Sequence, residues 1–316
     1  MNTLLFLVLQ LALALVLAPL LPGIINRVKA IVAGRRGKPL LQTYYDLARL
    51  LGKGEVISTT TSWVFCTGPV IALATVICAL PLLPLAGQPS PCAFDGDFLL
   101  AAYLLGLGRF AIILAALDTG SSFEGMGASR EATFSALAEP VLFLALLVLV
   151  ALSLEPPQAL QATKPPELSF SALLGGHAAL AWQDGRAELL LIPAIFFVLL
   201  LVENCRMPMD DPTTHLELTM IHEVMVLDHS GPTLACIVYG AALKLWFFVA
   251  LITALVLPPM PFWQHLGASL VLMFGLAVGV GVVESVMARL RLPVIPRLLA
   301  GALTLAALSL ILTLVR

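Results

Sequence analysis

The sequence predicts an all-α integral membrane protein with about eight transmembrane helices and with both termini on the outer side. The first observation behind this prediction is the composition: 60% of the 316 residues are hydrophobic, 11% are charged, and the mean hydropathy is +1.01. Soluble domains carry about 25% charged residues, so a soluble enzyme is excluded. The formal net charge of -2 gives no sign of the basic surface that nucleic-acid-binding proteins carry.

The second observation is the length of the apolar stretches, because a helix needs about 20 apolar residues to cross the roughly 30 Å hydrocarbon core of a bilayer. Eight stretches approach this length, and the fifth, which contains Pro193, is the shortest. The first stretch lacks a basic start and a cleavage site, so it is interpreted as a span and not as a signal peptide. The expected spans are residues 3–21, 64–85, 98–117, 135–154, 188–202, 234–257, 265–287 and 294–314.

The third observation is the uneven distribution of Lys and Arg. Alternating the loops between the two sides places twelve of these residues on one side and three on the other, with Arg109 and Lys244 inside spans. By the positive-inside rule, the side with twelve faces the cytoplasm. We therefore expect a single polytopic membrane domain over residues 1–316, with cytoplasmic loops at residues 26–62, 118–135, 203–233 and 288–296.

The first cytoplasmic loop contains the segment RRGKPLLQTYYDLARLLGKG. Leucines, Tyr44 and Ala48 recur at helical spacing after Pro39, which predicts an amphipathic helix. Such a helix lies on the membrane surface or anchors the loop against other protein, and the pattern is the same in both cases. The residues of this loop expected to dock a partner are Arg35, Arg36, Tyr44 and Tyr45.

The second cytoplasmic loop leads into the fourth span through a helix expected to begin at Arg130 and Glu131. Glu131 and Glu139 are eight residues apart, which places them on one helix face about 12 Å apart along the axis. A carboxylate inside a membrane is a functional candidate, so the pair is interpreted as two stations of a proton path; the alternative is a structural ion pair. Further ionisable residues in or near spans are Arg109, Lys244, which could be the counter-ion of Glu139, and Glu284.

The third cytoplasmic loop is rich in carboxylates and histidines. Asp211 followed by Pro212 predicts a helix start, and Gly231-Pro232 predicts its end. In this helix of roughly 17 residues, histidines recur every seven positions and share one face. The acidic cluster is expected to exchange protons or to meet a basic partner. The cluster comprises Glu203, Asp210, Glu217, Glu223 and Asp228 with Arg206, and the histidines expected at the partner interface are His215, His222 and His229.

No metal site is expected from the spacing of potential ligands. The five cysteines show no CxxC pattern. His222-Glu223 begins like the zinc protease motif HExxH, but position 226 is Val. The histidines are therefore interpreted as packing or docking residues.

Four segments in order along the chain carry a resemblance to a known family. They are RRGKPLLQTYYDLARLL, GASREATFSALAEP, the ExxRxPxD core from Glu203 to Asp210, and ESVMARLRLP from Glu284. Together they resemble the membrane subunit of group 4 nickel–iron hydrogenases, of the hydrogenase-4 component C and formate hydrogenlyase subunit 4 type. This type is similar to the quinone-chamber subunit, subunit 1, of respiratory complex I, and the resemblance covers nearly the whole chain.

The resemblance implies a non-catalytic membrane-anchor and proton-coupling subunit in the cytoplasmic membrane of a bacterium or archaeon. It implies no cofactor in this chain, with iron–sulfur clusters, and in true hydrogenases a nickel–iron centre, in the partner subunits. The implied partners are a hydrogenase-like large subunit, an iron–sulfur small subunit and antiporter-like membrane subunits. By position, Arg130 and Glu139 match a family arginine and glutamate, Glu203, Arg206, Asp210 and Glu217 match the acidic loop, and Arg289 and Arg291 match the basic turn before the last span.

The stretch after Glu217, LTMIHEVMVLDHSG, departs from the shorter acidic stretch of the relatives and introduces His222 and His229. Two alternatives stay open at this point. One is a quinone-binding subunit of a complex I-like dehydrogenase. The other, from a different class, is a stand-alone secondary transporter, which is expected to show an inverted repeat.

Overall fold

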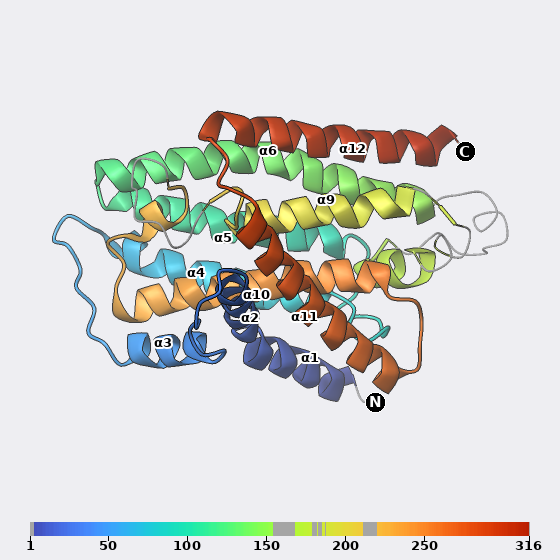
Figure 1. Cartoon of the computed structure of the whole chain (residues 1–316), viewed down its shortest axis with the longest axis horizontal. Helices are drawn as coiled ribbons and strands as arrows, with labels where there is room; N and C mark the ends of the chain where they lie inside the picture. The colour runs from blue at the N-terminus through green and yellow to red at the C-terminus, as the bar shows by residue number, and fades with distance from the viewer. Residues whose placement is uncertain are drawn as a thin grey trace.

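The computed structural model describes residues 3–153, 168–178, 182, 185–186, 188–210 and 220–315, and within them it contains helices and no regular β-strand. Figure 1 shows these helices gathered in one elongated bundle. The α-helices are α1 (Thr3–Leu17), α2 (Leu20–Val32), α3 (Gln42–Leu51), α4 (Trp63–Ala79), α5 (Asp97–Asp118), α6 (Ser122–Ser153), α9 (Glu188–Glu203), α10 (Gly231–Val256), α11 (Phe262–Val286) and α12 (Ile295–Val315). Shorter helical turns are η1 (Leu80–Leu82), η2 (Ala172–His177), η3 (Glu223–Val226) and η4 (Leu292–Val294).

The expected spans all coincide with helices of the described part. Seven helical stretches there are long and apolar enough to cross a membrane, and α9 forms an eighth, shorter apolar helix. The first stretch runs over Leu4–Val32, because α2 continues α1 after a break at Ala18-Pro19. The predicted end of that span at residue 21 was therefore wrong, since Arg27 and Lys29 lie on α2 and not in the following loop.

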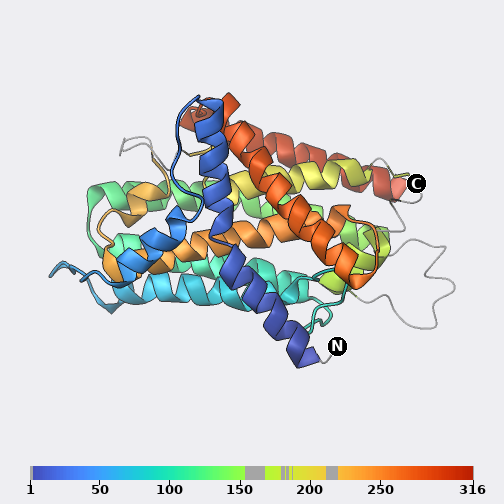
Figure 2. The same cartoon turned by 60° about the horizontal axis from the view of Figure 1, so that its bottom comes forward.

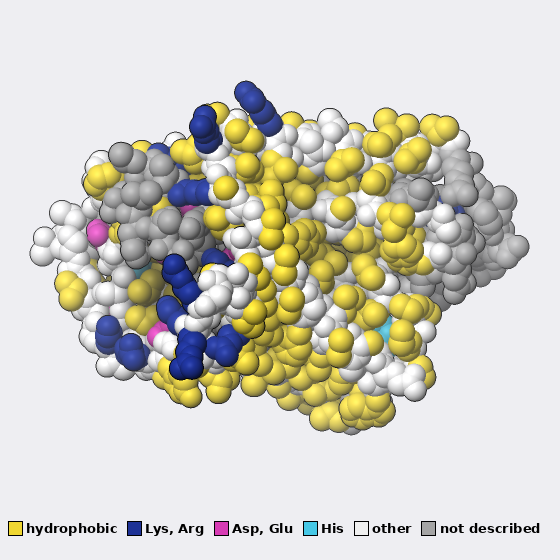
Figure 3. Space-filling view, in the orientation of Figure 1, with side chains coloured by type: hydrophobic (Ala, Val, Ile, Leu, Met, Phe, Trp, Pro, Cys, Tyr) yellow, Lys and Arg dark blue, Asp and Glu magenta, His cyan; other side chains and the backbone are white. Residues whose placement is uncertain are grey.

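Figures 1 and 2 show α4, α5, α6, α9, α10 and α12 running along the bundle, while α1, α2 and α11 cross it obliquely. The central helix is α10, which packs against α4, α9 and α11. Of the 18 residues in its most apolar part, 61% are buried. Both termini lie toward the end of the bundle opposite α3. Lys and Arg side chains gather at the end that carries α3, and hydrophobic side chains cover the middle (Figure 3). The side of the membrane that each end faces stays a prediction.

Small residues allow the closest helix contact, between α4 and α5. A Cβ atom on Gly68 would lie 2.7 Å from the carbonyl oxygen of Ala111, and one on Gly108 would lie 2.5 Å from Oγ1 of Thr75. Glycine at both positions therefore lets the two backbones approach, as small residues do between helices in membranes. This contact fixes the position of Arg109, the residue after Gly108.

Two predicted helix boundaries were wrong. Helix α6 begins at Ser122, eight residues before the predicted start at Arg130. The amphipathic helix predicted after Pro39 is confirmed as α3. The helix predicted to run from Pro212 to Gly231 does not extend through its second half, because residues 220–230 contain only the four-residue η3. The predicted shared face of the histidines fails for His222 and His229 for this reason, and His215 and Glu217 lie outside the described residues.

Candidate functional site

The candidate site is a charge network between helices α5, α6, α9 and α10, centred on Arg109. The Arg109 guanidinium donates from Nη2 to both carboxylate oxygens of Glu203 at 2.5 Å, and its Nη1 lies 3.5 Å from Oε1 of Glu139. Its Nε lies 3.7 Å from Oε1 of Glu131. Opposite charges that face one another offset the desolvation that a charged group meets inside a protein. We call Arg109, Glu131, Glu139, Glu203 and Lys244 the inner network.

Lys244 completes this network from the central helix α10. Its Nζ lies 2.8 Å from Oε2 of Glu203, which therefore sits between two cations. Lys244 is not the counter-ion of Glu139, as it could have been from the sequence: Glu139 pairs with Arg109, which lies on a different helix. The prediction that Glu131 and Glu139 share a helix face is confirmed, because both carboxylates face the same guanidinium.

The three carboxylates of the inner network differ in exposure. The side chain of Glu203 is 5% exposed and that of Glu131 is 12% exposed, whereas that of Glu139 is 50% exposed on the outer surface of the helix bundle. A half-exposed carboxylate on a membrane-spanning helix is expensive against lipid. The network therefore extends from the interior of the chain to a surface position that needs a polar neighbour.

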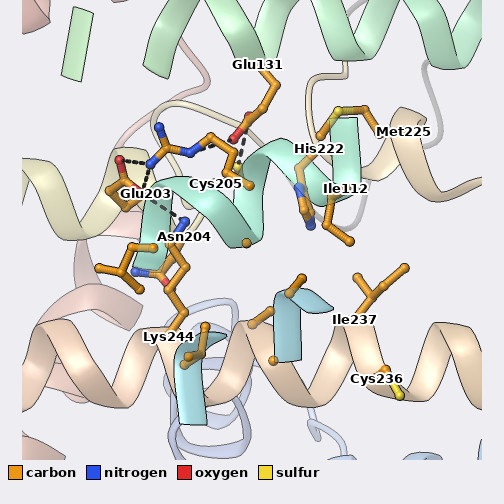
Figure 4. Close-up of a pocket in the computed structure, with 17 residues that line it drawn as sticks. Ile112, Glu131, Glu203, Asn204, Cys205, His222, Met225, Cys236, Ile237 and Lys244 are labelled. Atoms are coloured by element: carbon orange, nitrogen blue, oxygen red, sulfur yellow. Dashed lines mark hydrogen bonds and ion pairs between the residues drawn. The ribbon is translucent and has the colours of Figure 1, made fainter. Parts of the chain in front are cut away.

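A cavity of about 90 Å³ lies beside the network (Figure 4). Its polar end carries Arg109, Glu131, Glu203 and Lys244, and its walls are mostly apolar. At roughly 10–15 Å³ per water measured in this way, the cavity has room for several water molecules. Residues that line it and that the sequence analysis did not single out include Asn204, Cys205, Met225 and Cys236.

A second set of charges joins α2, the end of α11 and the segments that follow α9 and α11. We call its members the loop network. Asp210 accepts a hydrogen bond from Nη2 of Arg289 at 2.7 Å and from the backbone N–H groups of Ile221 and His222 at 2.9 and 3.1 Å. Glu284, whose side chain is fully buried, lies 2.9 Å from Nζ of Lys29 and 3.6 Å from Nη1 of Arg206. The loop network comprises Lys29, Arg206, Asp210, Glu284 and Arg289.

Other predicted coupling residues lie outside both networks. Arg130 donates from Nη1 to the backbone carbonyl of Met220 at 2.7 Å, so it holds the segment before η3. Glu223 begins η3 and is half-buried, while Asp228 and Arg291 are exposed. None of the pairings in either network follows from the sequence analysis, because the partners are far apart in the chain.

The predicted docking residues differ in how exposed their side chains are. Arg35, Arg36 and Tyr45 are exposed, as a docking role requires, whereas the Tyr44 hydroxyl donates to the backbone carbonyl of Val16 within the chain. His229 is 4% exposed and stacks on Phe65 with ring centroids 4.0 Å apart, so its side chain forms no part of a docking surface. Burial lowers the pKa of His229 to about 4, which keeps it neutral at physiological pH.

Comparison with known proteins gives the family. Residues 4–315 match the NADH dehydrogenase family. The chain is 32% identical over 249 residues to hydrogenase-4 component C of Escherichia coli K12, covering 79% of this chain and 74% of that protein. It is 31% identical over 289 residues to formate hydrogenlyase subunit 4 of the same organism, covering 89% of both chains.

The fold agrees with this assignment. A chain of the membrane-bound sulfane sulfur reductase, an archaeal respiratory membrane complex, superposes with a TM-score of 0.79, at 20% sequence identity, over 99% of this chain and 100% of that one. The resemblance to hydrogenase and complex I membrane subunits that the four sequence segments carry is thereby confirmed. The chain belongs to the NADH dehydrogenase family, in its complex I subunit 1 type.

Proposed function

We propose that this chain is the membrane-anchor and proton-coupling subunit of a multi-subunit, complex I-related oxidoreductase of the hydrogenase type. It links a cytoplasmic redox arm to antiporter-like membrane subunits and carries no redox centre itself. The observation that carries the proposal is the inner network, in which Arg109 faces three carboxylates. With only Lys244 as a second cation, the carboxylates outnumber the cations, so the network can hold a proton.

The geometry supports a proton path with a defined order. Glu203 contacts both cations and stays ionised, so the exchangeable proton belongs to Glu131 or Glu139, which have longer contacts to Arg109. When the Arg109 guanidinium turns toward one of these two carboxylates, the other loses its counter-charge. Water in the cavity supplies the link to Glu131, and the exposed Glu139 passes the proton to the neighbouring subunit.

The proposed partners follow from the surfaces that the fold leaves open. The end of the bundle that carries α3, where Lys and Arg side chains gather, fits a cytoplasmic large subunit and an iron–sulfur small subunit (Figure 3). The exposed Glu139 on α6 fits an antiporter-like membrane subunit. The relatives named hydrogenase-4 component C and formate hydrogenlyase subunit 4 support this assembly in the cytoplasmic membrane. In this proposal the iron–sulfur clusters and any nickel–iron centre belong to the partners.

The test is proton translocation by the complex in inverted membrane vesicles. Glu139→Gln is expected to leave assembly intact and to lower proton uptake per electron transferred by at least about tenfold, because proton transfer through a positioned group contributes about 10²–10⁴-fold. Asp95→Asn is the matched control, since Asp95 accepts a hydrogen bond from the backbone N–H of Leu168 outside both networks and away from α3. Unchanged proton uptake in the Glu139→Gln complex would overturn the proposal.

The second candidate function is quinone binding, which the apolar walls of the cavity favour. The volume argues against it, because small-molecule sites measure about 300–1,000 Å³ and this cavity measures about 90 Å³. Inhibition of turnover by a quinone-site inhibitor, with resistance in a Gly240→Val variant that narrows the cavity, would favour the quinone-binding candidate over the anchor. A complex that is insensitive to the inhibitor favours the anchor.

A further inference from the structure

Three metal-ligating side chains converge at one end of the cavity. One ligand atom each from Glu131, Cys205 and His222 lies within 4.8 Å of the others. Sγ of Cys205 lies 3.9 Å from Oε2 of Glu131. The three residues come from separate segments: helix α6, the turn after α9 and the turn before η3. Figure 4 shows Glu131 and His222 directed toward the part of the cavity where Cys205 lies.

The Glu131 side chain and the His222 backbone are each held by a second contact that leaves the ligand atom available. Oε1 of Glu131 faces Arg109, so that Oε2 is left on the side of Cys205. The backbone N–H of His222 bonds to Asp210 at 3.1 Å, and its imidazole makes no hydrogen bond within the described part of the chain. An outer contact of the kind that Glu131 makes with Arg109 is typical of metal ligands.

The backbone of Cys205 is unusual in a way that bears on the site. Its φ is +48°, a left-handed conformation that residues other than glycine, asparagine and aspartate seldom adopt. This conformation turns the chain directly after α9 and places the thiol in the cavity wall. A cysteine is no better than a glycine for such a turn, so the turn itself does not explain the thiol.

We infer that Glu131, Cys205 and His222 bind a divalent transition-metal ion of the Zn²⁺ type. Thiolate, imidazole and carboxylate are the three ligand classes that zinc takes in proteins, and three protein ligands leave a fourth position for a water. That position opens to the cavity, which has room for the water. Bonds of about 2.0–2.3 Å place tetrahedral ligand atoms roughly 3.3–3.8 Å apart, so the observed 3.9 Å needs only a small closure.

The neighbouring charges permit a cation here. Arg109 and Lys244 are the nearby cations, and Glu203 lies between them at 2.5 and 2.8 Å. Glu131 and the Cys205 thiolate supply two further negative charges when the metal displaces the thiol proton. A bound ion would draw Glu131 away from Arg109. Under the proposed function, zinc would therefore inhibit proton uptake, and only this consequence rests on the proposed function.

The test is zinc binding to the detergent-purified complex after removal of loosely held metal with a chelator. We expect the unchanged complex to bind one more zinc ion per chain than a Cys205→Ser complex. X-ray absorption at the zinc edge of the unchanged complex is expected to show one sulfur and two or three nitrogen or oxygen neighbours. Cys205→Ser, His222→Gln and Glu131→Gln are each expected to weaken zinc binding by at least about tenfold.

The cavity offers a matched control for each ligand. Cys236→Ser removes a thiol that lines the same cavity, and His229→Gln removes a buried imidazole outside the three-residue group. Glu139→Gln removes the other carboxylate that faces Arg109. These three complexes are expected to bind zinc as the unchanged complex does.

The inference is overturned if the unchanged complex retains no zinc in excess of Cys205→Ser, or if the X-ray absorption shows no sulfur neighbour. The second measurement uses the unchanged complex alone, so it decides the question even where a variant fails to assemble. Because both readouts measure binding, they are independent of proton translocation, and a failure of the proposed function would leave them unaffected.

Discussion

The inner network and the loop network use the same side-chain chemistry in opposite proportions. The inner network has three carboxylates for two cations and borders a cavity. Among the residues that the structure describes, the loop network has two carboxylates for three cations, and Asp210 also accepts two backbone hydrogen bonds. In the loop network each carboxylate is held by its own cations, whereas in the inner network three carboxylates share two cations. The comparison supports a structural role for the loop network and, under the proposed function, proton exchange in the inner network.

The largest expected effect comes from breaking the loop network at Asp210. Asp210→Ala leaves Arg289 and the N–H groups of Ile221 and His222 without this partner, and removal of one member of a buried ion pair lowers stability by about 3–5 kcal/mol. Thermal unfolding of the detergent-purified protein measures the loss. Asp210→Asn, which keeps an acceptor oxygen, is the control and is expected to lose less stability. If Asp210→Ala is as stable as the unchanged protein, the loop network has no structural role.

The turn that Asp210 holds also shows what the sequence could not predict. The apolar stretches predicted the helices because the bilayer requires spans of a given length, and the predicted site residues include every member of both networks except Lys29. The Asp211-Pro212 start and the Gly231-Pro232 end predicted a helix through residues 220–230, but Asp210 takes the N–H groups of Ile221 and His222 there, and only the four-residue η3 forms. A contact across eleven residues outweighed these local signals.

The ion pairs of the two networks could not be predicted from the sequence for a related reason. Arg109 and Glu203 are separated by 94 residues, and spacing along one helix carries no information about which helices adjoin. Glu131 and Glu139 could be paired correctly because they lie on one helix, where periodicity defines the shared face. Cys205 was missed because its partners lie on two other segments and no ligand spacing marks it in the sequence.

The next largest effect is a pH dependence that comes from the same turn. His229, buried against Phe65, has a pKa of about 4, below the ordinary 6.5. Above pH 6.5 both folded and unfolded states are neutral at this residue; between pH 6.5 and 4 only the unfolded state binds a proton, so stability falls as the pH falls. The loss is roughly 2 kcal/mol by pH 5 and roughly 3 kcal/mol by pH 4.

The measurement compares unfolding by denaturing detergent at pH 7 and pH 5 in the unchanged protein and in His229→Phe. The aromatic replacement keeps the stacking on Phe65 and removes the titrating group. Its stability is expected to change less between the two pH values, by the amount assigned to the histidine. The same pH dependence in both proteins would show that other groups cause it.

A smaller effect on stability is expected from Glu203→Gln in the inner network. The amide still accepts from Arg109 and Lys244, and Arg109 retains Glu131 and Glu139, so the loss is that of charge-assisted hydrogen bonds, roughly 1.5–3 kcal/mol. Thermal unfolding beside Asp210→Ala measures it. A loss larger than that of Asp210→Ala would reverse the comparison and make the inner network the structural one.

The smallest effect on stability is expected at Glu139, and this prediction separates coupling from folding. Its carboxylate is half-exposed and lies 3.5 Å from Arg109, so Glu139→Gln is expected to change the unfolding free energy by less than about 1 kcal/mol. A large loss would mean that the surface carboxylate belongs to the scaffold. A small loss together with impaired proton uptake would place the function of the network in the carboxylate that contributes least to holding the chain together.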